Sequence, residues 1–126
     1  GAFVCSYLKD TDFEEQGAIR DDAEILIDIL RGIAGVRVAL ILKENGKGEI
    51  RGSLRAKDET DVAQIARDFG GGGHKAAAGL TYHKSLADAL IEVPTDVIET
   101  CFPEDAEAEV ERLCILIRSL QEELDD

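Results

Sequence analysis

The sequence predicts an α/β (α+β) fold: a small mixed central β-sheet that contains a β-hairpin, is flanked by helices and is followed by an acidic C-terminal helix. Three observations predict it: short aliphatic and β-branched runs, apolar residues recurring at helical spacing between them, and strong glycine-containing turns. With 126 residues, the chain is long enough for one domain with a single core and too short for two ordinary domains.

The first third of the chain predicts a strand, a helix and a second strand. Residues 3–8 form a short β-like run. A helix should begin near Asp21, whose charge suits a helix N-terminus, and end at Gly32 and Gly35. A β-branched and aliphatic run at residues 36–42 then indicates a central strand. The apolar positions of the helix are Leu26, Ile29, Leu30 and Ile33.

A hairpin is expected next. The segment Asn45-Gly46-Lys47-Gly48 is a strong turn signal, so residues 50–56 should return antiparallel to the preceding strand. Successive side chains of a strand point to opposite faces. One face should therefore contact the core, and the other carries Arg51, Ser53, Arg55 and Lys57. A polar row of this kind is also typical of a half-exposed sheet, and solvation alone explains any single member.

The next predicted element is a helix. Asp61 is expected to be its N-cap, with Gln64 three residues later as in a capping box. The helix must stop at Gly70. Its apolar positions are Val62, Ile65, Ala66 and Phe69.

Three elements are expected in the rest of the chain. Residues 80–83 indicate a strand and residues 85–92 a helix, which Pro94 should break. Pro103 can start a last, acidic helix, which we expect to be buried against another surface. The helical repeat there consists of Val110, Leu113, Ile117, Leu120 and Leu124.

The charge distribution is uneven. The formal net charge is −13, which excludes a generic polyanion-coating protein. Residues 43–75 nevertheless hold 7 basic against 6 acidic side chains, while residues 1–42 hold 4 and 8, residues 76–99 hold 1 and 4, and residues 100–126 hold 2 and 9. The only positive window therefore predicts an anion-binding spot within an acidic protein.

The cysteines, the apolar stretches and the first residues of the chain indicate the cellular compartment. An odd number of cysteines without Cys-x-x-Cys spacing suggests neither a disulfide framework nor a zinc site: Cys5, Cys101 and Cys114. No apolar stretch approaches the ~18 residues of a membrane span. We therefore expect a cytoplasmic protein without membrane association. The start at Gly1-Ala2-Phe3, with neither Met nor signal sequence, leads us to expect a piece of something longer.

Four glycines, Gly70 to Gly73, precede His74 in the positive window. A flexible linker is one explanation, although such linkers continue in Gly, Ser and polar residues. The other is a backbone that approaches something closely in conformations that only glycine adopts readily. Consecutive amides turned inward can form a nest for phosphate. The run lacks both the P-loop ending and the dinucleotide-binding spacing.

His74 and Arg55 strengthen the phosphate interpretation. An imidazole can donate a hydrogen bond to a phosphoryl oxygen, and a guanidinium can clamp two such oxygens. A lone loop histidine is more often an exposed or satisfied side chain. Its position directly after the glycines, in a window that contains arginines, favours a ligand role.

Residues 52–55, 61–66 and 69–79 together resemble the DHH-associated domain, the C-terminal domain of DHH-family phosphoesterases. The resemblance covers about residues 20–92 in order and spacing, and glycine-His-x-x-Ala-Ala-Gly is its most specific element. The sequence is most similar to the nanoRNase and pAp phosphatase branch. Those enzymes hydrolyse short oligoribonucleotides, linear dinucleotides or cyclic di-AMP, and often dephosphorylate 3′-phosphoadenosine 5′-phosphate (pAp).

The resemblance also implies a substrate-binding site. Arg55 matches the family's phosphate-binding arginine. The phosphate-binding loop corresponds to Gly71, Gly72, Gly73 and His74, with Arg51, Ser53 and Lys75 as secondary candidates. Ala56 departs from the family, in which a Ser often follows the arginine, so one hydroxyl ligand is expected to be missing.

Catalysis is expected to need a further domain. In such enzymes an N-terminal DHH domain holds two Mn²⁺ or Mg²⁺ ions with Asp and His ligands. This chain has two histidines, His74 and His83, and neither lies in a ligand cluster. We therefore expect it to bind substrate without cutting it, with no catalytic residue and no metal ligand of its own.

Other functions stay open at the level of sequence. One is a non-catalytic nucleic-acid-binding module such as the related domain that ends alanyl-tRNA synthetases, where it serves tRNA binding. A nucleotide sensor with a degenerate partner domain and a single-stranded DNA exonuclease relative are further options.

The expected organisation is a strand and linker from a missing DHH domain at 1–19, the DHH-associated domain at 20–99 and a helical extension at 100–126. Expected partners are short RNA, a dinucleotide or a nucleotide phosphate, and the protein's own DHH domain; homodimerisation is left open.

Overall fold

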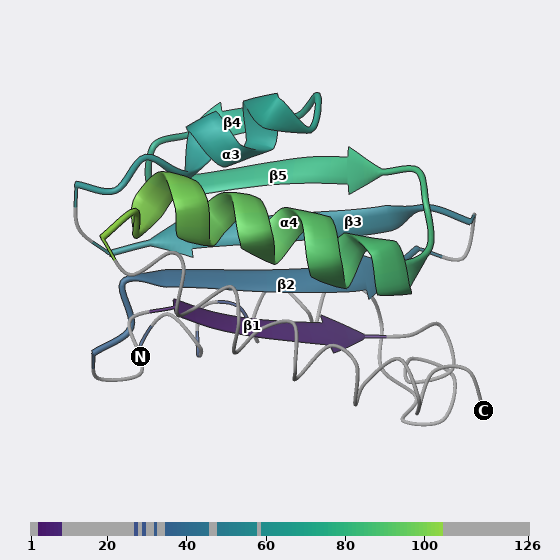
Figure 1. Cartoon of the computed structure of the whole chain (residues 1–126), viewed down its shortest axis with the longest axis horizontal. Coiled ribbons are helices and arrows are strands. Elements are labelled where there is room, and N and C mark those ends of the chain that lie inside the picture. Colours follow the sequence, from purple (N-terminus) through teal and green to yellow (C-terminus); the bar gives the residue numbers. More distant parts are fainter. Residues whose placement is uncertain are drawn as a thin grey trace.

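The computed structural model of the chain describes residues 3–8, 27, 29, 32, 35–45, 48–57 and 59–104. These residues form a five-stranded sheet in the order β1-β2-β3-β5-β4 (Figure 1). β1 pairs in parallel with β2, and the other neighbouring strands are antiparallel. The sheet is therefore mixed, as predicted. Its strands are β1 (Phe3–Leu8), β2 (Val38–Glu44), β3 (Ile50–Ala56), β4 (Gly72–His74) and β5 (Ala77–Tyr82).

Most strands were predicted, with differences at their ends. β1 and β3 have the predicted bounds, and β2 begins and ends two residues later than predicted. β1 falls within the segment assigned to a strand and linker, and it forms an edge of this sheet. The strand predicted at 80–83 was too short, since β5 already begins at Ala77, where it pairs with Arg55 of β3. The first residues of β5 were not predicted as strand because alanine and glycine have low strand propensity.

Two helices lie on one face of the sheet, α3 (Val62–Asp68) and α4 (Leu86–Cys101) (Figure 1). The predicted N-cap of α3 is confirmed, because Asp61 Oδ1 accepts a hydrogen bond from the Ala63 amide at 3.0 Å. The expected capping box does not form. The side chain of Gln64 instead bonds to Arg67 and Asp68, one turn further along the helix.

The prediction that Pro94 breaks the last of these helices was wrong. α4 continues through it to Cys101. A proline inside a helix costs about 3 kcal/mol, since it removes one backbone hydrogen bond and crowds the preceding turn. Here Pro94 and its neighbours Val93 and Val97 are completely buried. The apolar area that they remove from water offsets the cost of the proline.

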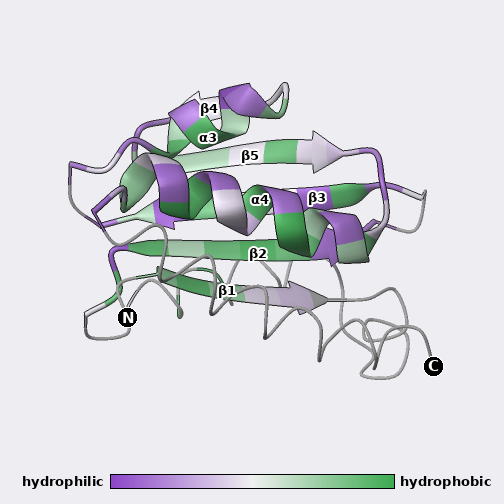
Figure 2. Cartoon of the chain, in the orientation of Figure 1, coloured by the Kyte–Doolittle hydropathy of each residue, from purple (hydrophilic) through white to green (hydrophobic). Residues whose placement is uncertain are grey.

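The main core lies between the sheet and the two helices. It combines the inward-facing residues of β2, β3 and β5 with the buried faces of α3 and α4. Figure 2 shows β2 as apolar over most of its length, in keeping with a strand buried on both faces. On the opposite face, Ile27 packs with Val36, Ala39 and Ile41 in a smaller cluster. That face is therefore covered at β2, next to β1.

Some predicted elements fall outside the described residues. The helix expected from Asp21 is described only at Ile27 and Ile29, both helical. Of the last helix, Pro103 and Glu104 are described and lie in a turn, and its repeat of apolar residues lies beyond them. The hairpin between β2 and β3 is confirmed, although the middle of its turn is not described.

Candidate functional site

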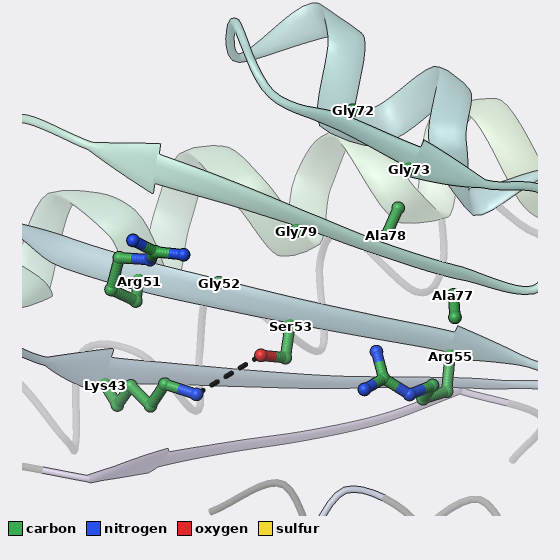
Figure 3. Close-up of a pocket in the computed structure, with 10 residues that line it drawn as sticks. All are labelled: Lys43, Arg51, Gly52, Ser53, Arg55, Gly72, Gly73, Ala77, Ala78 and Gly79. Carbon is green, nitrogen blue, oxygen red and sulfur yellow. Dashed lines mark hydrogen bonds between the residues drawn. The ribbon is translucent and has the colours of Figure 1, made fainter. Parts of the chain in front are cut away.

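Strand β3 places three of the candidate side chains on one face of the sheet. Arg51, Ser53 and Arg55 alternate with core residues, so they point away from α3 and α4 (Figure 3). The hairpin register sets Lys43 of β2 directly opposite Arg51. Opposed residues of paired strands share a face. We call the face that carries these four residues the site face.

Strands β5 and β4 extend the site face with small residues. Gly79 lies opposite Ser53, and Ala77 lies opposite Arg55. In the next strand Gly72 lies opposite Gly79. The backbone is consequently exposed between the basic side chains of β3 and the edge strand β4.

These residues line an open pocket of about 290 Å³ (Figure 3). Three lining side chains are cations, Lys43, Arg51 and Arg55, and none is a carboxylate. In a protein of net charge −13, this is a local concentration of positive charge. The remaining lining residues are Gly52, Ser53, Gly72, Gly73, Ala77, Ala78 and Gly79.

Hydrogen bonds orient two of the cations. The Nζ of Lys43 donates to the Oγ of Ser53 at 3.3 Å, and the Nη1 of Arg55 donates to the carbonyl of Leu54 at 2.9 Å. Ser53 is 8% exposed, and it is the one buried polar residue in the described part of the chain. Arg55 is half-buried, which restricts the positions of its guanidinium. A fixed guanidinium loses less conformational entropy when it binds a phosphate.

The glycine run is a close contact between strands. A Cβ at Gly71 would lie 2.2 Å from the Gly79 carbonyl oxygen, and one at Gly73 would lie 2.7 Å from the Ala77 carbonyl oxygen. The predicted close approach is therefore real, and its partner in this structure is β5. The three residues Gly72–His74 form a strand where a phosphate-binding nest was expected, and the Gly71 amide donates to the Ala66 carbonyl at 2.7 Å.

Not every predicted binding residue reaches the pocket. Arg55, Gly72 and Gly73 line it, together with the secondary candidates Arg51 and Ser53. The remaining three predicted residues, Gly71, His74 and Lys75, are absent from its lining.

Each of these three residues has a different position. His74 lies opposite Ala77, so it shares the site face with Arg55, and it is exposed. Lys75 instead forms an ion pair with Glu59 at 2.5 Å. Gly71 lines a neighbouring pocket of about 560 Å³, which shares Arg51, Gly72 and Gly79 with the first.

Sequence reasoning missed Lys43 and the small residues of β5. The hairpin held the signal for Lys43, since counting back across the predicted turn sets this residue opposite Arg51. The small residues of β5 were missed because this strand was expected to begin at Leu80, and it begins at Ala77.

Two further features bear on cofactors and membranes. Among the described residues, no three His, Cys, Asp or Glu side chains gather where they could hold one metal ion. In the same part of the chain, no helix is both long and apolar enough to cross a membrane.

Solved structures share this fold. An exopolyphosphatase-related protein from Bacteroides fragilis superposes with a TM-score of 0.64 at 24% identity, over 86% of this chain and 30% of that one. The chain thus spans less than a third of that relative's length. The C-Ala domain of Aquifex aeolicus alanyl-tRNA synthetase gives a TM-score of 0.52 at 16% identity, over 88% of this chain and 89% of that one.

A pGpG-specific phosphodiesterase from Vibrio cholerae gives a TM-score of 0.38 at 17% identity, over 64% of this chain and 25% of that one. The sequence itself matches the DHHA1 domain, the DHH-associated domain, over residues 1–100. That match includes all of the described sheet and nearly all of α4. The chain therefore belongs to the DHHA1 domain family.

Proposed function

We propose that this chain is the substrate-binding domain of a metal-dependent DHH-family phosphoesterase that acts on short oligoribonucleotides, on linear or cyclic dinucleotides, or on pAp. The observation that carries the proposal is the pocket on the site face, lined by three cations and no carboxylate. Family membership supports the same role, because the family is named for its association with DHH domains.

The pocket suits a phosphate for three reasons. A guanidinium can donate two parallel hydrogen bonds to phosphate oxygens. The glycines of β4 and β5 let a ligand approach the backbone closely. Lys43 and Arg51 add positive charge where the overall acidity of the protein would otherwise repel an anion. Together these residues would bind the phosphate and fix the orientation of the attached nucleoside.

The proposal assigns no bond cleavage to this chain. Mn²⁺ or Mg²⁺ would supply the hydrolytic chemistry in an upstream DHH domain. The described residues of this chain do not fit such a metal, since they offer no cluster of three ligands. What the chain contributes is positioning, and holding a substrate in one orientation can account for much of a rate enhancement.

A binding measurement tests the proposal on the chain itself. Titration calorimetry with AMP should show saturable binding, and Arg55→Ala should weaken it at least about tenfold, because hydrogen bonds to charged groups are strong. Arg67→Ala is the matched control, since Arg67 lies on α3, behind the sheet, and pairs with Asp61. Equal affinities for wild type and Arg55→Ala would overturn the assignment.

The activity needs the longer protein. The chain joined to its upstream DHH region should hydrolyse pAp or a ribodinucleotide in the presence of Mn²⁺, and the Arg55→Ala form should be slower or require more substrate. If the wild-type joined protein bound these compounds but left them intact, the nucleotide-sensor alternative would replace the enzyme.

A non-catalytic nucleic-acid-binding module is the second candidate. The C-Ala domain of alanyl-tRNA synthetase supports it, because the two chains cover nearly all of each other, whereas the phosphoesterase-related neighbour is much longer. The salt dependence of the binding constant distinguishes these two candidate functions. A small ligand with few phosphate contacts gives a shallow slope of log K against log salt, and an RNA groove gives a steep one.

A further inference from the structure

The pocket contains a pair of like charges on adjacent strands. Lys43 and Arg51 face each other directly across the β2–β3 hairpin, on the same face of the sheet. Such neighbours have Cβ atoms about 5 Å apart, and like charges in that position destabilise a sheet. An anion held between them would remove the repulsion.

Arg51 is also available to a ligand. Within the described part of the chain, its guanidinium has no hydrogen-bond or ion-pair partner, and the residue is exposed. It lines both the 290 Å³ pocket (Figure 3) and the adjoining 560 Å³ pocket, so it stands where the two meet. By contrast, Arg55 is half-buried and bonded to the carbonyl of Leu54.

The two arginines are well separated. Four residues of strand place Arg51 about 13 Å from Arg55 between their Cα atoms, with Ser53 midway. A phosphate monoester carries about −1.5 to −2 at pH 7, and three cations line the pocket. Two phosphates match this charge and spacing better than one.

We infer that Lys43 and Arg51 form a second anion position, and that the pocket binds ligands with two phosphates, one beside Arg55 and the backbone of Gly72 and Gly73, the other between Lys43 and Arg51. This inference rests on the proposed function and extends it. A nucleoside attached to the second phosphate has room in the adjoining pocket, beyond Arg51 and next to Thr81.

The test compares one-phosphate and two-phosphate ligands. Calorimetry with AMP, pAp and the 5′-phosphorylated dinucleotide pApA should show the latter two binding at least about tenfold more tightly than AMP. Arg51→Gln and Lys43→Gln should each abolish most of that preference, because they should weaken pAp and pApA more than AMP. Arg55→Gln should weaken all three ligands, and the control Arg67→Gln none.

The melting temperature of Arg51→Gln and the salt dependence of its ligand binding distinguish an effect on binding from an effect on folding. Without ligand, Arg51→Gln should melt no lower than wild type, because the substitution removes the repulsion from Lys43. Its slope of log K against log salt should fall by about one for pAp and by less for AMP.

Three results bear on the inference in different ways. If Arg51→Gln weakened AMP and pAp equally, the cations would share a single phosphate position and the inference would be wrong. A wild-type chain that bound AMP as tightly as pAp would contradict it equally. If the wild-type chain bound none of the three ligands, the proposed function itself would fail.

Discussion

Asp68 of α3 and Asp96 of α4 hold their carboxyl groups against each other where the two helices meet. The Oδ2 of Asp96 is buried, and no donor group in the described structure bonds to it. Burial, together with a hydrogen bond to Asp68 and its charge, raises the pKa of Asp96 from 3.8 to about 6. Protonation turns the buried oxygen into a donor toward Asp68.

This pair makes stability depend on pH. Because the pKa of Asp96 is higher in the folded chain than in the unfolded chain, the folded state binds the proton more readily. The protonated pair therefore stabilises the fold fully below about pH 4, and this contribution is lost as the pH rises through about 6. Asp96→Asn should raise the melting temperature at pH 8 more than at pH 4, as measured by thermal denaturation.

A double-mutant cycle tests whether the interaction between Asp68 and Asp96 causes this pH dependence. Asp68→Asn should give a similar gain at pH 8, and the double variant should gain less than the sum of the two, since either substitution removes the repulsion. Additive gains, or equal gains at both pH values, would show that the two carboxyl groups do not interact.

Substitutions in the glycine run should distinguish residues that the fold needs from a residue that ligand binding needs. Gly71→Ala and Gly73→Ala should each destabilise the fold by about 1–3 kcal/mol, because the new Cβ would collide with the backbone of β5. At Gly72 a Cβ meets nothing within 4 Å, and the residue lines the pocket. Gly72→Ala should therefore keep its melting temperature and lose about tenfold in AMP affinity, since the methyl group would enter the pocket.

The difference between these variants tests whether the glycine run contributes to ligand binding or only to packing. If Gly72→Ala bound AMP normally, the glycines would serve only the packing of β4 on β5. A stable Gly71→Ala variant would mean that the two strands are not held as closely as described.

His74 should make a smaller contribution than Arg55. It shares the site face but does not line the pocket. We expect His74→Ala to weaken AMP binding about twofold to tenfold, the range of one typical hydrogen bond. Calorimetry on His74→Ala beside His83→Ala checks this, because His83 is also exposed and pairs with Glu49 at 3.4 Å. Unchanged affinity in His74→Ala would remove this residue from the site.

Much of the fold could be predicted because local signals agree with it. The alternation in β3 and the turn after β2 specify the hairpin, and Asp61 and Gly70 bound α3. The prediction at Pro94 was wrong because the sequence shows the local cost of a proline inside a helix. It does not show that Pro94 is buried in the folded chain. β4 was missed because three residues without apolar alternation become a strand only by pairing with β5.

The arrangement of the candidate side chains on β3 was predicted. Arg51, Ser53 and Arg55 share a face by strand periodicity alone, and this is what the structure shows. The opposition of Lys43 to Arg51 needed the register of the hairpin, and the glycine contacts needed the neighbouring strand. The carboxyl pair of Asp68 and Asp96 joins two helices, and no pattern along the chain indicates it.

A crystal structure of the chain grown with AMP would show directly whether the site-face pocket binds phosphate. We expect density for the phosphate in this pocket, with the guanidinium of Arg55 on one side and the backbone of Gly72 and Gly73 on the other. A nucleotide bound elsewhere on the chain, with this pocket empty and Arg55 turned away from it, would show that the pocket is not the phosphate site.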